Sequence, residues 1–485
     1  MINQCSMVNI CIPFMMLFHL FLFLFFEIFI GIFMSVLRVY HPREPKKSPL
    51  WQILNRHYED FEKSYDERFE KKFGFFRPVI SEVVRAYLRC GDLKDGFARV
   101  RCPKCGHEYL LQFSCKVRCF CPSCQAKRVV LFGHHLKENV FYPVPHRQYV
   151  FSLPKILRIY FKHDRSLLTG LCQCAYKSLL TFLRQVVQLK NGVPGAVMAI
   201  HTFGEYPDKF HPHIHVIATD GLFNDNGLFY VMRETDLKPL EDLFRAEVFN
   251  ILKKEGKING EIIKKLMSWK YSGFSVDNGV RISEKDEKGR ESVAQYIMRN
   301  AFNASKITYI EKSGKVIYHS KMQKGKNRKN FMVYTAEEFI AAITQHIPKK
   351  SFQMSRYYGW YSNKARGVRL KNDIEVSEQE KEKTKDVEII DVSKYQPKKV
   401  PSLTWRECIK KIWKDDPLIC PECLSEMKII SFIENPRIIK KILKYLDLWK
   451  ESSSRGPPVQ SVIPDEIVYV PIDDGWVQPD SDFLS

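Results

Sequence analysis

The chain has 485 residues, of which 45% are hydrophobic and 27% charged, which is typical of a soluble globular protein with two to four domains. Its formal net charge of +21 indicates a polyanionic partner, with nucleic acid ahead of an anionic membrane surface. Most of the 14 cysteines lie in local clusters with Cys-x-x-Cys spacing, which argues against a secreted disulfide framework. We therefore expect a cytoplasmic, nucleoid-associated protein.

The first 33 residues are an apolar leader that needs a separate explanation. Ile10 to Phe33 is long enough to span a bilayer, but no Lys or Arg precedes Arg38 and no small-residue cleavage site follows the apolar run. A secretory signal is therefore not indicated. We favour a start codon assigned too far upstream, with Met34 as the true start. A membrane anchor is expected only if this leader is real.

A helical lead-in is expected over residues 34–95, because apolar residues recur three and four positions apart between Leu50 and Leu93. A zinc-binding domain is expected over residues 96–145. There, Cys102-Pro-Lys-Cys105 and Cys121-Pro-Ser-Cys124 are separated by 15 residues, which is the spacing of a four-cysteine zinc ribbon. Four thiolates close the coordination shell, so the predicted Zn²⁺ is structural.

Other residues of the zinc segment have less certain roles. Cys115 and Cys119 lie between the two Cys-x-x-Cys pairs and are spare thiols, alternative ligands or buried small residues. The cations Arg118, Lys127 and Arg128 predict a basic edge that contacts DNA.

The next segment, residues 146–370, predicts an α+β domain with an antiparallel sheet. Val197–Phe203 and His213–Ala218 read as strands, and the turn formers between them favour antiparallel pairing. His211, His213 and His215 alternate along the second strand, so their side chains project from one face of the sheet. Two imidazoles on one face can hold a divalent ion.

The end of this domain predicts a second hairpin and a basic loop. Thr308–Ile310 and Val316–Tyr318 flank a glycine-containing turn. The loop that follows carries Lys324, Lys326 and Arg328, which we expect to contact a phosphate backbone.

The last third of the chain is expected to hold a linker and a small module. Residues 371–400 are rich in charge and poor in aromatic residues, which is typical of a linker. Residues 401–485 contain Cys420-Pro-Glu-Cys423, which is half of a zinc site. Cys408 is a candidate third ligand and no fourth is evident, so metal binding there stays open.

Glu291 to Asn300 reads as a short helix that carries Tyr296. A tyrosine phenol can attack a DNA phosphodiester that a metal ion polarises, which leaves a 5′-phosphotyrosine and a free 3′-hydroxyl. Together with the histidine strand and the basic charge, this suggests DNA nicking and joining.

Several segments resemble rolling-circle transposases of the insertion sequence 91 family, which have an HUH-type nuclease core. The resemblance runs in order from about Met34 to about Trp449. It is carried by the following segments: Phe113-Ser-Cys-Lys and Phe120-Cys-Pro-Ser-Cys124; Pro194 to Gly204; His211-Pro-His-Ile-His-Val216; Gln345-His-Ile-Pro-Lys349; and Arg356-Tyr-Tyr-Gly-Trp-Tyr-Ser-Asn363.

The resemblance implies a catalytic metal site and a nucleophile. The ligands of Mg²⁺ or Mn²⁺ would be His213 and His215, with His211 in support and Asn300 as a candidate third ligand. Tyr296 would be the nucleophile. Members with two tyrosines carry the second one four residues earlier, where this chain has Ser292.

Two tyrosines of the later motif, Tyr357 and Tyr361, also have four-residue spacing, but Gly359 between them and the absence of helical patterning favour a loop or packing role. The resemblance implies single-stranded DNA at the ends of a mobile element as partner, a homo-oligomer as one possibility, and no small-molecule substrate. The alternative function is a non-catalytic, zinc-dependent DNA-binding protein descended from a transposase.

Overall fold

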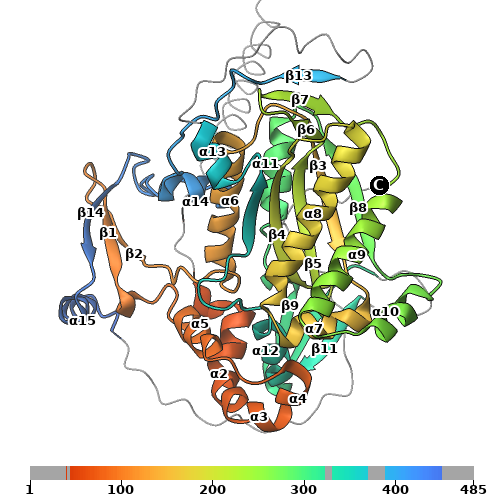
Figure 1. Cartoon of the computed structure of the whole chain (residues 1–485). Coiled ribbons are helices and arrows are strands. Elements are labelled where there is room, and N and C mark those ends of the chain that lie inside the picture. Colours follow the sequence, from red (N-terminus) through yellow and green to blue (C-terminus); the bar gives the residue numbers. More distant parts are fainter. Residues whose placement is uncertain (1–39, 41–43, 323–329, 370–387, 450–485) are drawn as a thin grey trace, which may run out of the picture. The chain divides into compact units, whose positions relative to one another are not determined.

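The computed structural model describes residues 40, 44–322, 330–369 and 388–449 (Figure 1). They form two compact units. The ribbon unit comprises Leu93–Phe113 and Thr404–Leu448 together with Tyr40. The core unit comprises the described residues of Glu44–Asp92 and Ser114–Leu403 together with Trp449. Each unit is described by itself.

The core unit is built on a five-stranded antiparallel sheet with strand order β12-β4-β5-β3-β8. Its strands are β3 His146–Ser152, β4 Gly195–Phe203, β5 Phe210–Thr219, β8 Ser275–Ile282 and β12 Ser355–Gly359. The predicted pairing of the two central strands, β4 and β5, is confirmed, and so is the α+β class with antiparallel sheets.

One face of this sheet packs under helices α8 and α9 (Figure 1). These are α8 Leu167–Val187 and α9 Lys238–Lys254, with the shorter α7 Arg158–His163 and α10 Gly260–Met267 beside them. Ile214 and Val216 of β5 belong to this core. They are the even-numbered residues of the strand, so the odd-numbered histidines must face the other side.

The opposite face packs against α6 Pro122–Asn139 and α11 Glu287–Tyr296. Val197, Ala199 and Ile217 of the sheet meet Ala294 and Ile297 there. This second core fixes α11, and with it Tyr296, over the face that carries the histidines.

A third core joins the helical lead-in to a small sheet. The lead-in consists of α2 Pro49–Lys63, α3 Tyr65–Arg68, α4 Glu70–Phe73 and α5 Val79–Leu88, and α12 Ala336–Thr344 packs with it. The sheet, of order β11-β10-β9, consists of β9 Ile307–Ile310, β10 Lys315–His319 and β11 Phe331–Thr335. The predicted helices and the predicted second hairpin are therefore confirmed.

The segment expected to be a linker is partly ordered. β13 Ile389–Asp391 pairs with β7 Leu228–Val231, which also pairs with β6 Gly221–Phe223. Val392 is buried in the second core. The charged composition predicted a linker, but residues 389–391 form a strand because their main chain pairs with β7. The short helix α13 Asn363–Arg369 precedes this segment.

The ribbon unit has a three-stranded sheet of order β14-β1-β2. Its elements are β1 Phe97–Arg101, β2 Glu108–Gln112, β14 Lys428–Ile433, α14 Trp405–Trp413 and α15 Pro436–Tyr445. The predicted zinc-binding domain over 96–145 is thus divided, because Phe113 ends the first segment of this unit and Ser114 begins the next segment of the core unit. The rest of the ribbon unit comes from the predicted C-terminal module.

The 3₁₀ turns are η1 Pro45–Lys47, η2 Leu93–Asp95, η3 Lys155–Leu157, η4 Ala304–Lys306 and η5 Glu311–Ser313. Within the described residues no helix is both long and apolar enough to cross a membrane. The apolar leader and the predicted DNA contacts Lys324, Lys326 and Arg328 lie outside the described residues.

Candidate functional site

Three buried histidines form a cluster on the α6/α11 face of the core sheet. His201 of β4 pairs in register with His213 of β5, and His215 lies two residues further along the same strand. One ring nitrogen of each can serve as a ligand atom, and these three atoms lie within 4.8 Å of one another. The strand pairing thus builds a three-nitrogen site from two segments of the chain.

Hydrogen bonds decide which nitrogen of each ring is free. The His213 Nδ1–H donates to the His211 carbonyl at 2.8 Å, and the His201 Nε2–H donates to the Ile297 carbonyl at 2.8 Å. The His215 Nδ1 lies 3.2 Å from the side-chain amide of Gln148. Such bonds from the outer nitrogen orient an imidazole toward a metal ion.

The inner nitrogens fit a metal ion. His201 Nδ1 and His215 Nε2 are buried and have no hydrogen-bond partner among the described residues. Buried polar atoms are normally paired, so two unpaired nitrogens that face a third imidazole match the donor set that a divalent cation needs.

Burial also prepares the imidazoles as ligands. Desolvation lowers the pKa of His213 to about 3 and holds the pKa values of His201 and His215 well below the usual value. The neighbouring imidazoles and the Arg299 guanidinium lower them further. The rings are therefore neutral near pH 7, which is the form that binds a metal.

Tyr296, the predicted nucleophile, lies beside this cluster. Its ring centroid is 5.6 Å from that of His215, and Tyr296 is 38% exposed whereas the histidines are buried. Tyr296 is the last residue of α11. Gly133 of α6 allows α11 to approach closely, since a Cβ there would lie 2.7 Å from Cγ of Gln295.

Arg299 adds a positive charge at the tyrosine. Its guanidinium carbon lies 4.7 Å from the ring centroid of Tyr296 and 5.4 Å from that of Phe203. A cation over an aromatic face is attracted by the ring, and this one remains exposed beside the phenol.

Two predicted ligands are placed elsewhere. His211 is not part of the cluster, and its backbone carbonyl, rather than its ring, orients His213. The Asn300 amide donates to the Phe120 carbonyl at 3.3 Å. The expectation that Asn300 shares a helical face with Tyr296 is wrong, because α11 ends at Tyr296.

Sequence reasoning missed His201, although a signal for it was present. The predicted antiparallel pairing of Val197–Phe203 with His213–Ala218 allows a register that places His201 opposite His213. His201 alternates with the core residues of β4, which assigns it to the histidine face.

The later tyrosines do not line the cluster. Tyr361 is fully buried, and its hydroxyl lies 2.8 Å from Nε2 of His146. Tyr357, on β12, packs partly buried against the second core. Both placements agree with the packing role predicted for them.

The cysteines form two clusters where one was predicted. Cys121 and Cys124 join Cys90 and Cys115 in the core unit, with Sγ–Sγ distances of 3.8 Å for Cys90–Cys121 and 3.6 Å for Cys115–Cys124. Cys119 is in neither cluster.

The other predicted pair, Cys102 and Cys105, meets Cys420 and Cys423 in the ribbon unit. The structure therefore contradicts the prediction that Cys102, Cys105, Cys121 and Cys124 form one zinc ribbon, because the two pairs lie in different clusters. Cys408 is buried on α14 and belongs to neither cluster. The third and fourth cysteines of the cluster around the C-terminal pair are thus Cys102 and Cys105, from the N-terminal part of the ribbon unit.

The predicted DNA contacts of the zinc segment lie around the start of α6. Lys127 and Arg128 are on this helix, and Arg128 is exposed. Arg118 is partly buried and donates to the Lys349 carbonyl at 3.2 Å. Arg128 also donates to a backbone carbonyl, that of Lys116 at 3.4 Å, while Lys127 is partly exposed.

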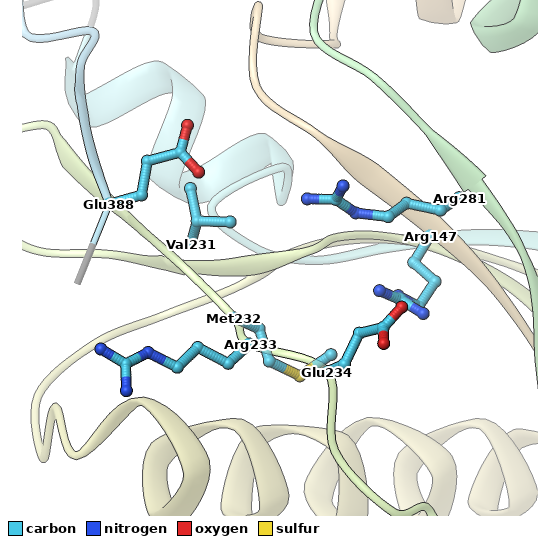
Figure 2. A pocket seen from close by; sticks show the side chains of 7 residues that line it. All are labelled: Arg147, Val231, Met232, Arg233, Glu234, Arg281 and Glu388. Carbon is cyan, nitrogen blue, oxygen red and sulfur yellow. The ribbon is translucent and has the colours of Figure 1, made fainter. Parts of the chain in front are cut away.

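A cavity of about 370 Å³ lies beside β3 and β8, and none of the three histidines lines it (Figure 2). Its lining residues are Arg147, Val231, Met232, Arg233, Glu234, Arg281 and Glu388. Arg147 and Arg281 both bind the buried Asp220 carboxylate, at 2.7 and 2.6 Å. Together with Arg233 these two arginines carry three positive charges, and Asp220, Glu234 and Glu388 carry three negative ones, so the cavity has no surplus of positive charge for an anion.

Comparison with known proteins identifies the family. The model of a family described as "Putative transposase" matches residues 195–368, a range that contains the three histidines and Tyr296. A second model, "Transposase zinc-binding domain", matches residues 53–153, which include Cys90, Cys115, Cys121 and Cys124. The chain belongs to the insertion sequence 91 family of transposases.

Curated relatives of this transposase are distant but cover most of it. The transposase for insertion sequence element IS801 of Pseudomonas savastanoi pv. phaseolicola is 23% identical over 369 residues, which is 73% of this chain and 84% of that protein. "Putative transposase y4qJ" of Sinorhizobium fredii is 23% identical over 332 residues, 64% of this chain and 81% of that protein. No solved structure matches the chain. The zinc-binding match and the cysteine clusters together support structural zinc.

Proposed function

We propose that this transposase nicks and rejoins single-stranded DNA at the ends of its mobile element through a 5′-phosphotyrosine on Tyr296. The observation that carries the proposal is the exposed Tyr296 beside three buried imidazoles, two of which, His201 and His215, have an inner nitrogen without a hydrogen-bond partner among the described residues. A DNA strand reaches the tyrosine from solvent, while the histidines lie beneath it.

The reaction balances without a further reagent. The Tyr296 oxygen bonds to phosphorus and gives up its proton, while the bond from phosphorus to the 3′ oxygen breaks and that oxygen takes up a proton. The phosphotyrosine retains the energy of the phosphodiester, so a 3′-hydroxyl can reverse the step on another strand.

The residues of the site have distinct roles in this scheme. His201, His213 and His215 would hold the metal ion, for which three imidazoles favour Mn²⁺ over Mg²⁺. A divalent ion held there supplies Lewis-acid polarisation of the scissile phosphate. The Arg299 guanidinium, 4.7 Å from the Tyr296 ring, would stabilise the developing phenolate and the phosphate charge.

Ser292 stands where relatives with two tyrosines carry the other one. A single tyrosine permits one covalent attachment per chain, so we propose that a DNA 3′-hydroxyl or a second subunit completes the second transfer. The four-cysteine cluster of Cys90, Cys115, Cys121 and Cys124 would hold a structural Zn²⁺ in the part of the protein that grips the element's end.

The test is a nicking assay with Mn²⁺ on single-stranded oligonucleotides that cover both ends of the element. The unmutated protein should form a covalent protein–DNA adduct that denaturing gels resolve, and Tyr296→Phe should form none. Tyr357→Phe is the matched control and should retain the adduct. If the zinc-loaded, unmutated protein forms no adduct, the non-catalytic DNA-binding alternative is favoured.

A further inference from the structure

We propose that the ribbon unit holds a second structural Zn²⁺, bound by Cys102 and Cys105 from one part of the chain and Cys420 and Cys423 from another. The latter pair lies outside both matched regions, which end at residue 368. This site is separate from the cluster in the core unit and does not depend on the proposed reaction.

The sulfur positions fit a tetrahedral ion. Cys102 Sγ lies 3.5 Å from Cys423 Sγ, and Cys105 Sγ lies 3.5 Å from Cys420 Sγ. All four sulfurs lie within 4.8 Å of one another, and none forms a disulfide. Zn–S bonds of about 2.3 Å give a tetrahedron with S–S edges of about 3.8 Å, close to the observed distances.

The two Cys-Pro-x-Cys loops have the same backbone geometry. In the first, the Gly106 N–H donates to the Cys102 carbonyl at 3.1 Å, and Gly106 has a φ of +77°. In the second, the Leu424 N–H donates to the Cys420 carbonyl at 3.0 Å, with a φ of +57°. A left-handed conformation is disfavoured for leucine, so its adoption here indicates a constraint that a bound ion would supply.

A hydroxyl group supports the sulfurs. The Ser425 Oγ lies 3.1 Å from Cys102 Sγ and 2.8 Å from Cys423 Sγ. A serine between two ligands from distant segments can donate a hydrogen bond to a thiolate and so stabilise its charge.

The buried side chains around the sulfurs form a small cluster. It contains Val100, Cys102, Cys420 and Met427, and two of these four are proposed ligands. Other apolar side chains of the unit, among them Phe97, Ile409 and Leu443, are buried outside this cluster. A metal ion would therefore add to a small apolar cluster at the point where the two segments of the unit meet. Four thiolates leave no open coordination position, so the role of the ion is structural.

The first experiment counts zinc in the full-length protein by elemental analysis. All proteins carry His213→Ala and His215→Ala, so that only cysteine-bound zinc is counted. We expect two zinc ions per chain. Cys420→Ser/Cys423→Ser should retain one, Cys121→Ser/Cys124→Ser should also retain one, and the control Cys408→Ala should retain two. A count of two in Cys420→Ser/Cys423→Ser, or iron in place of zinc, would overturn the proposal.

The second experiment needs no variant and therefore cannot fail through misfolding. Cys105 is exposed and Cys423 is partly exposed, so burial alone does not protect them from alkylation. In the zinc-loaded protein both should resist iodoacetamide and become reactive once a chelator removes the metal, as read by mass spectrometry. Alkylation of both while two zinc ions stay bound would exclude them as ligands. Neither readout changes if Tyr296 proves not to form an adduct.

Discussion

At the scale of single residues, the site depends on which nitrogen each imidazole presents. The backbone carbonyl of His211 accepts a hydrogen bond from the Nδ1–H of His213, and that of Ile297 accepts one from the Nε2–H of His201. Ligand choice is therefore fixed by main-chain geometry, and His211 acts through its carbonyl rather than its ring.

We predict that His201→Ala lowers the affinity for Mn²⁺ by at least about 10-fold, because it removes a ligand and not only an outer partner. The matched control is His211→Ala, which removes an adjacent ring but keeps the carbonyl that orients His213. Isothermal titration calorimetry of the zinc-loaded proteins measures both affinities. Equal losses in the two variants would show that His201 is not a ligand.

A second residue-scale prediction concerns stability in acid. Burial lowers the pKa of His146 to about 3 in the folded protein, against about 6.5 when unfolded. As the pH falls below about 6.5 the unfolded state takes up the proton first, so stability is full above that pH and is lost progressively toward pH 3.

When the pH falls from 7.5 to 5.5, protonation of His146 in the unfolded state should lower the free energy of unfolding by about 1.4 kcal/mol. Urea unfolding at both pH values checks this, and His146→Gln should lose about 1.4 kcal/mol less than the unmutated protein over the same interval. The other titrating groups are common to both proteins. An identical pH dependence would contradict the assignment of a neutral, buried His146.

At the scale of elements, the ends of strands and helices place the reactive groups. The end of α11 exposes Tyr296, and the end of β12 turns sharply at Gly359, which has a φ of +56°. The sequence motif around Gly359 predicted a loop or packing role for its tyrosines, and Tyr361 is indeed buried directly after this turn.

We predict that Gly359→Ala destabilises the core unit by at least about 2 kcal/mol. A Cβ there would lie 2.0 Å from the Pro194 carbonyl oxygen, on a backbone that disfavours side chains. The control is Gly367→Ala on α13, where nothing lies within 4 Å and alanine improves helix propensity. Thermal unfolding compares the two, and a neutral Gly359→Ala would show that the turn can relax.

At the scale of the whole molecule, the net charge of +21 indicates how DNA is held. Single-stranded DNA releases about 0.7 counterions for each phosphate contacted, so five contacts predict a log–log salt slope of about −3.5. The affinity should then fall about 100-fold between 50 and 200 mM salt.

We predict that Lys127→Ala/Arg128→Ala reduces the magnitude of this slope by about 1.4, if both cations on α6 contact phosphates. Lys253→Ala/Lys254→Ala removes the same charge from α9, on the other face of the core sheet, and should leave the slope unchanged. Fluorescence anisotropy over a salt series gives the slopes. Equal changes in both variants would indicate a general charge effect rather than a contact at α6.

The sequence alone determined what local patterns encode. Alternation placed His213 and His215 on one face, helical periodicity predicted the lead-in, and turn residues predicted both hairpins, because each of these depends on neighbours within a few positions. The family resemblance, carried by motifs in order, added Tyr296.

Only the tertiary structure decided which distant groups meet. His201 joins the cluster through strand register, and Cys102 meets Cys423 across 321 positions of sequence. The spacing of a Cys-x-x-Cys pair does not encode which other pair it meets. The nearest pair in sequence, Cys121 and Cys124, is therefore not the one that Cys102 and Cys105 meet in the structure. The fold selects partners by long-range packing and pairing, which spacing along the chain does not record.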